Sequence, residues 1–175
     1  RWLIASSRPF SNSELILHPE MSAPKIVETV KEEVAKDASV IVVNFANSDM
    51  LAHTGNLDAT ISALNILDDS LREIMKNVAL LKEYFTIITC DHGNSEELID
   101  PMTGGIDTQH STSNVPIVII GDGFAHKDGS GAKNLKELAD QNPIGSLFDI
   151  APTALKIIGI EQPKEMTGSP LFIKQ

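Results

Sequence analysis

The fold class is indicated by one stretch of the sequence, Phe85-Thr86-Ile87-Ile88-Thr89-Cys90-Asp91-His92-Gly93-Asn94. It is an apolar, β-branched run that passes directly into an aspartate and a histidine. Residues 40–44 form a second apolar run, and Asp49 and His53 follow it closely. Such runs between helical patterns are typical of buried parallel strands, and open α/β sheets bind ligands beyond the carboxyl ends of their strands. Two strand ends carrying oxygen and imidazole ligands suggest a metal site.

Helical patterns lie on either side of these runs. Ser22 is expected to cap a helix with Pro24 in its first turn, and apolar residues then recur on one face up to Val34. A longer amphipathic helix is predicted from apolar residues that recur on one stripe, Leu57, Ile61, Leu64, Leu71, Ile74 and Val78.

The C-terminal third continues the alternation. A third strand is predicted at residues 115–120, and Asp149 is expected to cap a last helix with Pro152 in its first turn and Gly159 at its exit. Strands that alternate with helices imply right-handed crossovers. We therefore expect an α/β fold with a mostly parallel sheet flanked by helices.

Composition limits the classes of function. The 175 residues suit one globular domain, and 24 acidic against 14 basic residues give a net charge of −10, which disfavours nucleic acid and anionic membranes as partners. No apolar stretch approaches the roughly 20 residues of a membrane span, so a cytoplasmic protein is expected. Cys90, the only cysteine, cannot form an internal disulfide and is expected to be buried at its strand end.

Five residues are candidate metal ligands: Asp49, His53, Asp91, His92 and His110. Asp49 and His53 are four residues apart and share a face if they lie on a helical turn. Asp91 and His92 are adjacent, and a sharp turn after the strand can bring both to one ion. Each pair alone also fits helix capping or a bond to backbone. Their joint occurrence at strand boundaries favours a site for two divalent ions.

These residues lie in motifs that resemble cofactor-independent phosphoglycerate mutase, a family of the alkaline phosphatase superfamily. The resemblance is carried by residues 44–55, Asn-Phe-Ala-Asn-Ser-Asp-Met-Leu-Ala-His-Thr-Gly, and by residues 89–97, Thr-Cys-Asp-His-Gly-Asn-Ser-Glu-Glu. Further matching stretches lie at residues 19–23, 100–105, 149–153 and 165–168. In residues 107–116, the chain departs from the family pattern by lacking the first histidine and the Asn-Pro step.

The resemblance implies an enzyme that interconverts 3-phosphoglycerate and 2-phosphoglycerate through a phosphoserine, with two divalent ions, usually manganese. It implies that Asp49, His53 and His110 bind one ion. It assigns Asp91 and His92 to the other, together with an aspartate and the nucleophilic serine from an N-terminal region. The substrate is a small phosphorylated molecule, whose arginine contacts would also come from elsewhere, because only Arg1, Arg8 and Arg72 are present.

By this resemblance, residues 1–175 are the C-terminal segment of an alkaline phosphatase-like domain, incomplete on its N-terminal side. The nucleophile segment and the inserted transferase domain are expected upstream, so no catalytic residue is assigned within the chain and the chain alone is expected to be inactive. Its exposed sheet edge is expected to favour self-association. Two alternatives remain: another metal-dependent phosphohydrolase or phosphomutase of the superfamily, and a non-catalytic metal-binding or interaction module.

Overall fold

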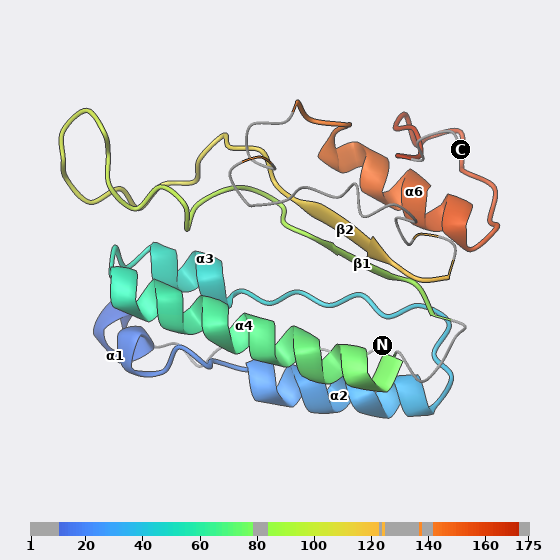
Figure 1. Cartoon of the computed structure of the whole chain (residues 1–175), viewed down its shortest axis with the longest axis horizontal. Coiled ribbons are helices and arrows are strands. Elements are labelled where there is room, and N and C mark those ends of the chain that lie inside the picture. The colour runs from blue at the N-terminus through green and yellow to red at the C-terminus, as the bar shows by residue number, and fades with distance from the viewer. Residues whose placement is uncertain (1–10, 79–83, 123, 125–136, 138–141, 172–175) are drawn as a thin grey trace. The chain divides into compact units, whose positions relative to one another are not determined.

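The structure is a computed structural model that describes residues 11–78, 84–122, 124, 137 and 142–171. The chain divides into two compact units (Figure 1). The first is built from residues 1–84 and 92–112, and the second from residues 85–91 and 113–175. Two of the three arginines, Arg1 and Arg8, lie outside the described residues.

The described residues of the first unit form four helices: α1 (Asn12–Leu17), α2 (Ala23–Ala35), α3 (Asn47–Ala52) and α4 (Leu57–Val78). The predicted helices at α2 and α4 are confirmed, and α2 begins after Ser22 with Pro24 in its first turn. The short helix α1 was not predicted. Because α3 places residues 49 and 53 one turn apart, it provides the helical turn on which the expected Asp49–His53 pairing depends.

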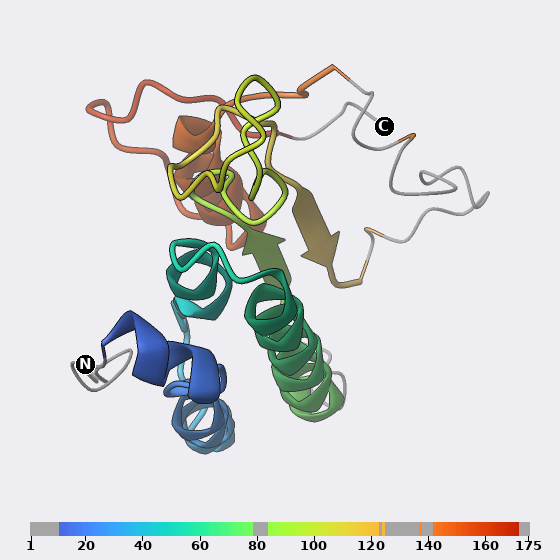
Figure 2. The ribbon, with the colours of Figure 1, turned by 90° about the vertical axis from the view of Figure 1, so that its left-hand side faces the viewer.

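Two small cores hold these helices together. In one, Val27, Val30 and Val34 of α2 pack with Ile74 and Val78 of α4, and the two helices lie side by side (Figures 1 and 2). The second core joins α1, α3 and the start of α4 through Leu15, Leu51, Ala59 and Ala63. The first core thus joins α2 to α4, and the second fixes α3 against α4.

The predicted apolar stripe of α4 is wrong in its first half. Leu57, Ile61 and Leu64 are exposed, whereas Ala59 and Ala63 are buried. The start of α4 packs closely against α3, and small side chains allow that approach where leucine or isoleucine would hold the helices apart. The prediction holds at Ile74 and Val78, where α2 is the partner.

The second unit contains β1 (Thr86–Thr89), β2 (Ile117–Ile120), the 3₁₀ turn η1 (Leu147–Asp149) and α6 (Ile150–Ile157). Both strands were predicted, but they pair antiparallel, with Thr86 opposite Ile120. The expectation of parallel pairing is therefore wrong for them. A parallel pair needs a crossover, usually helical, whereas residues 90–116 contain no helix and return the chain directly.

Residues 40–44, predicted as a strand, form no ladder with any described residue. Val42 is 91% exposed. β-branched residues suit a pleated surface, but a strand is stable only when a neighbour pairs with its backbone. Cys90 is also exposed rather than buried, because it lies one residue beyond the end of β1.

Asp149 organises the C-terminal part of the second unit. Its buried carboxylate accepts hydrogen bonds from the backbone N–H groups of Ser146 (2.9 Å) and Ser169 (2.7 Å). Asp149 occupies the predicted N-cap position of α6, but its side chain makes no capping bond there. A Cβ at Gly168 would lie 2.3 Å from the carbonyl oxygen of Phe148, so only glycine fits this approach. The matching stretches around residues 149 and 168 thus contact each other within the second unit.

Within the described ranges, every helix is too short or too polar to cross a membrane.

Candidate metal centre

Helix α3 supplies two of the predicted ligands. Asp49 lies in its first turn and His53 at its C-terminal cap, one helical turn away. Oδ1 of Asp49 lies 3.3 Å from Nε2 of His53. Both side chains are about one third exposed, so the carboxylate and the imidazole are anchored in the first unit while their polar atoms stay accessible.

His110 adds a third ligand from a loop that is distant in sequence. Its Nε2 lies 3.3 Å from Oδ1 of Asp49 and 3.1 Å from Nε2 of His53. These three atoms form a nearly equilateral triangle. Ligands about 2.0–2.2 Å from one ion, at tetrahedral or octahedral angles, are separated by about 2.8–3.6 Å. The Asp-His-His cluster of Asp49, His53 and His110 therefore fits a single divalent cation.

The ring orientation of His53 also suits a metal ligand. Its Nδ1 lies 2.6 Å from the backbone carbonyl of Thr108, and because a carbonyl can only accept, Nδ1–H is the donor. A neutral ring protonated at Nδ1 leaves a lone pair on Nε2, the atom that faces Asp49 and His110. A second hydrogen bond of this kind fixes the tautomer of histidines that bind metals.

Two asparagines that the sequence analysis did not place in the site hold it in shape. Nδ2 of Asn94 donates to Oδ1 of Asp49 over 2.7 Å. Nδ2 of Asn47 donates to the carbonyls of Pro19 (2.8 Å) and Glu20 (3.0 Å), which anchors the start of α3. The signal available in the sequence was the position of each asparagine inside a matching motif.

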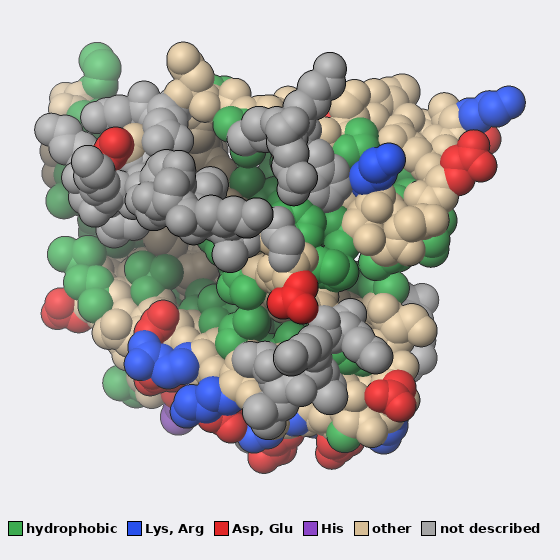
Figure 3. All heavy atoms as spheres, turned by 45° about the vertical axis from the view of Figure 1, so that its right-hand side comes forward, with side chains coloured by type: hydrophobic (Ala, Val, Ile, Leu, Met, Phe, Trp, Pro, Cys, Tyr) green, Lys and Arg blue, Asp and Glu red, His purple; other side chains and the backbone are tan. Residues whose placement is uncertain are grey.

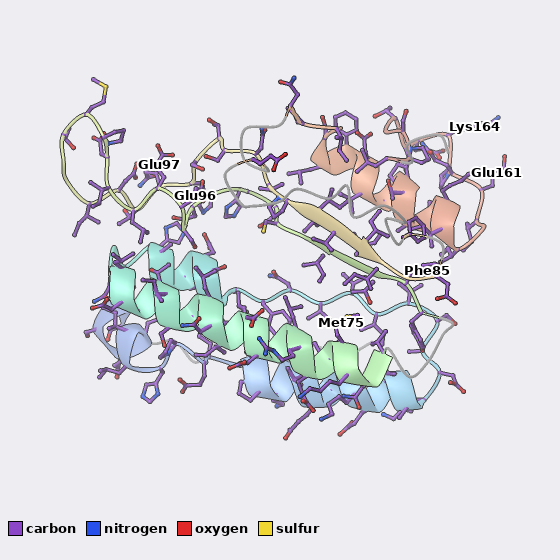
Figure 4. The ribbon with its side chains drawn as sticks, in the orientation of Figure 1. Met75, Phe85, Glu96, Glu97, Glu161 and Lys164 are labelled. Atoms are coloured by element: carbon purple, nitrogen blue, oxygen red, sulfur yellow. The ribbon has the colours of Figure 1, made fainter. Side chains whose placement is uncertain are left out.

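The loop that carries His110 is tied to the stretch around Asn94. The backbone N–H of Ser111 donates to the carbonyl of Gly93 over 2.8 Å. Glu96 accepts two hydrogen bonds: its Oε2 accepts one from the backbone N–H of Asn94 (2.9 Å), and its Oε1 accepts one from the hydroxyl of Ser111. Figure 4 labels Glu96 beside Glu97 on this loop. One carboxylate thus joins the residue that contacts Asp49 to the neighbour of His110.

The structure brings three of the five predicted ligands together, and the other two differ. The ring of His92 stacks on that of His110, with centroids 3.7 Å apart and planes 17° from parallel. His92 thus supports a ligand of the cluster without belonging to it. Asp91 is exposed and belongs to the second compact unit. A second ion on Asp91 and His92 stays a prediction.

Comparison with known proteins agrees with this chemistry. The family model of the metalloenzyme superfamily matches residues 10–162. The chain is 42% identical over 161 residues to the 2,3-bisphosphoglycerate-independent phosphoglycerate mutase of Ruegeria sp., and 39% identical over 158 residues to that of Escherichia coli. These stretches cover 90% of this chain but only 28% of each relative.

A solved structure shows the same likeness in three dimensions. The phosphoglycerate mutase of Leishmania mexicana, crystallised at low cobalt concentration, superposes with a TM-score of 0.67 and 27% sequence identity. The match covers 91% of this chain and 30% of that protein. Both matches support the expected alkaline phosphatase-like fold. Because the family model covers most of its length, the chain belongs to the metalloenzyme superfamily.

Proposed function

We propose that Asp49, His53 and His110 bind one divalent cation, with manganese as the natural ion. One observation carries this proposal: the three ligand atoms lie 3.1–3.3 Å apart in a chain of the metalloenzyme superfamily. One carboxylate and two imidazoles suit manganese as well as zinc. The hydrogen bond from His53 to Thr108 and that from Asn94 to Asp49 supply the outer support that metal ligands need.

We further propose that the chain is part of a phosphoglycerate mutase that interconverts 3-phosphoglycerate and 2-phosphoglycerate through a phosphoserine. Support comes from its identity to named mutases over 90% of its length. A bound cation would polarise phosphoryl oxygens. This chain's own residues would orient it: α3 presents Asp49 and His53, and the 92–112 loop presents His110.

The remaining parts of the reaction fall to residues outside the cluster. We propose that Asp91 and His92 contribute to a second ion, completed by an aspartate and the nucleophilic serine of the intact enzyme. The 175-residue chain would then have no mutase activity by itself, because binding a metal cannot replace a nucleophile. A glycolytic enzyme of this kind would act in the cytoplasm.

A chimera tests this assignment. The 175 residues would replace the matching 28% of the Escherichia coli relative, and conversion of 3-phosphoglycerate to 2-phosphoglycerate would be measured with manganese present. We expect the chimera to be active and its His53→Ala variant to be inactive. The matched control is His18→Ala, because His18 lies at the surface, half exposed, beside Glu20.

Other results would favour the alternatives. A folded chimera, with cooperative thermal unfolding, that binds manganese and hydrolyses phosphate esters but makes no 2-phosphoglycerate would support a phosphohydrolase. A folded chimera that binds manganese through His53 without any phosphoryl chemistry would support a metal-binding module. Equal activity of the His53→Ala and His18→Ala variants would exclude the Asp-His-His cluster as the functional metal site.

A further inference from the structure

Asn94 is a buried amide at the edge of the Asp-His-His cluster. Its side chain is part of a residue that is only 4% exposed, and its Nδ2 donates to Oδ1 of Asp49 over 2.7 Å. This is the same carboxylate oxygen that faces the two histidine nitrogens at 3.3 Å. A hydrogen bond to that oxygen therefore determines where the carboxylate stands between the rings.

The backbone of Asn94 is held as firmly as its side chain. Glu96 accepts the N–H of Asn94, and the hydroxyl of Ser95 donates to the carbonyl of Ser48 over 3.2 Å. Ser48 precedes Asp49 on α3. Two hydrogen bonds thus connect this stretch to α3: the side-chain amide of Asn94 contacts Asp49, and the hydroxyl of Ser95 contacts Ser48.

The oxygen of the same amide group differs from its nitrogen. Oδ1 of Asn94 is buried and has no hydrogen-bond partner among the described residues. A buried acceptor left unpaired destabilises the fold, so proteins retain one mainly where another donor completes it. The same amide group already contacts the cluster, because its Nδ2 donates to Asp49. A divalent cation held by three protein ligands keeps waters that can donate a hydrogen bond.

We propose that Asn94 is a positioning residue of the metal centre, which orients the Asp49 carboxylate through Nδ2 and offers Oδ1 to a water in the shell of the cation. The inference rests on the proposed metal site. It adds a role for a residue outside the three proposed ligands, whose contact with the cluster is made by its amide nitrogen. Positioning by Asn94 leaves the carboxylate free to face both histidines at once.

The test compares Asn94→Ala with Asn77→Ala in the 175-residue chain. Asn77 is a matched control, since its Nδ2 also donates one hydrogen bond, over 2.8 Å to the carbonyl of Glu73, away from the site. Calorimetry would measure the Kd for Mn²⁺. We expect Asn94→Ala to raise the Kd about 10-fold to 100-fold, the usual loss for an outer-shell partner, and Asn77→Ala to leave it within twofold.

A second measurement separates positioning from general structural support. The visible absorption spectrum of bound Co²⁺, taken at saturating Co²⁺, reports the ligand geometry of the folded population alone. We expect Asn94→Ala to change this spectrum and Asn77→Ala to leave it as in the wild type. An unchanged spectrum, or a Kd equal to that of Asn77→Ala, would overturn the role of Asn94 while the metal site stands. Binding of Mn²⁺ by the wild-type chain that survives His53→Ala would overturn the metal site itself.

Discussion

Nε2 of His53 and Nε2 of His110 lie 3.1 Å apart, although 57 positions separate them in the chain. Both atoms also lie 3.3 Å from the same oxygen of Asp49. This arrangement favours binding of one cation, because each of the two imidazole nitrogens and the carboxylate oxygen can offer it a lone pair.

His53→Ala should weaken Mn²⁺ binding by more than the roughly 10-fold to 100-fold loss that outer-shell changes cause, because it removes a ligand. His92→Ala should weaken it less, since His92 stacks on His110 and is not one of the three ligands of the cluster. Calorimetry on the 175-residue chain gives both values, with His18→Ala as the control. A larger loss for His92→Ala than for His53→Ala would show that the ligands are assigned wrongly.

Glu96→Ala should loosen the loop that carries His110. Glu96 joins the backbone N–H of Asn94 to the hydroxyl of Ser111, and the amide of Ser111 is bonded to Gly93. Hydrogen exchange should show faster exchange of the Ser111 amide in Glu96→Ala. Glu97→Ala is the neighbouring control and should leave that amide as in the wild type. Equal protection in both variants would count against the link.

Asn47→Ala should lower the free energy of unfolding by about 1–3 kcal/mol, because it removes hydrogen bonds to the carbonyls of Pro19 and Glu20 at a site that is 2% exposed. Urea unfolding followed by circular dichroism measures the change. Asn65→Ala on the exposed side of α4 is the control and should shift the free energy by less than about 0.5 kcal/mol. Equal shifts would mean that Asn47 does not anchor α3.

Lys31 and Glu73 join α2 to α4 through a 2.7 Å contact between Nζ and Oε1. Figure 3 shows basic and acidic side chains next to one another along the lower part of the view. The hydrogen bond from Lys31 lowers the pKa of Glu73 below its ordinary value. A lowered folded-state pKa stabilises the fold above the unfolded pKa, and the contribution disappears as the pH falls through the folded pKa.

Lys31→Met should therefore raise the pKa of Glu73, which NMR titration of the Glu73 carboxyl can measure. The variant should be less stable than the wild type at neutral pH. The two proteins should be equally stable at a pH low enough to protonate Glu73 in both. A stability difference that persists unchanged at acidic pH would indicate lost packing of the lysine side chain instead of a lost charge interaction.

Residues 40–43 should promote self-association, because Val40 and Val42 are exposed and this apolar run pairs with no described strand. Sedimentation velocity at increasing concentration should show species larger than the monomer. Val42→Lys should shift the distribution toward monomer, while Lys36→Ala, a change of a charged residue nearby in sequence, should not. A strict monomer at high concentration would contradict the prediction.

Local features of the fold followed from the sequence. The helices α2 and α4 were predictable because their apolar residues repeat with the helical period, and the strand β1 was predictable because it is a short apolar, β-branched run. The spacing of Asp49 and His53 was predictable for the same reason, since four residues is about one helical turn. The spacing of residues did not connect His110 with Asp49 and His53; only the resemblance to a known family implied that the three share an ion.

Tertiary structure alone decided how these parts meet. Periodicity does not encode the path of residues 92–112, yet that path brings His110 to Asp49, places Asn94 behind the carboxylate and makes β1 and β2 antiparallel. The same dependence explains residues 40–44, whose composition suits a strand but whose backbone finds no pairing partner among the described residues. Contacts across such separations depend on which surfaces the folded chain brings together, and a window of neighbouring residues carries no record of that.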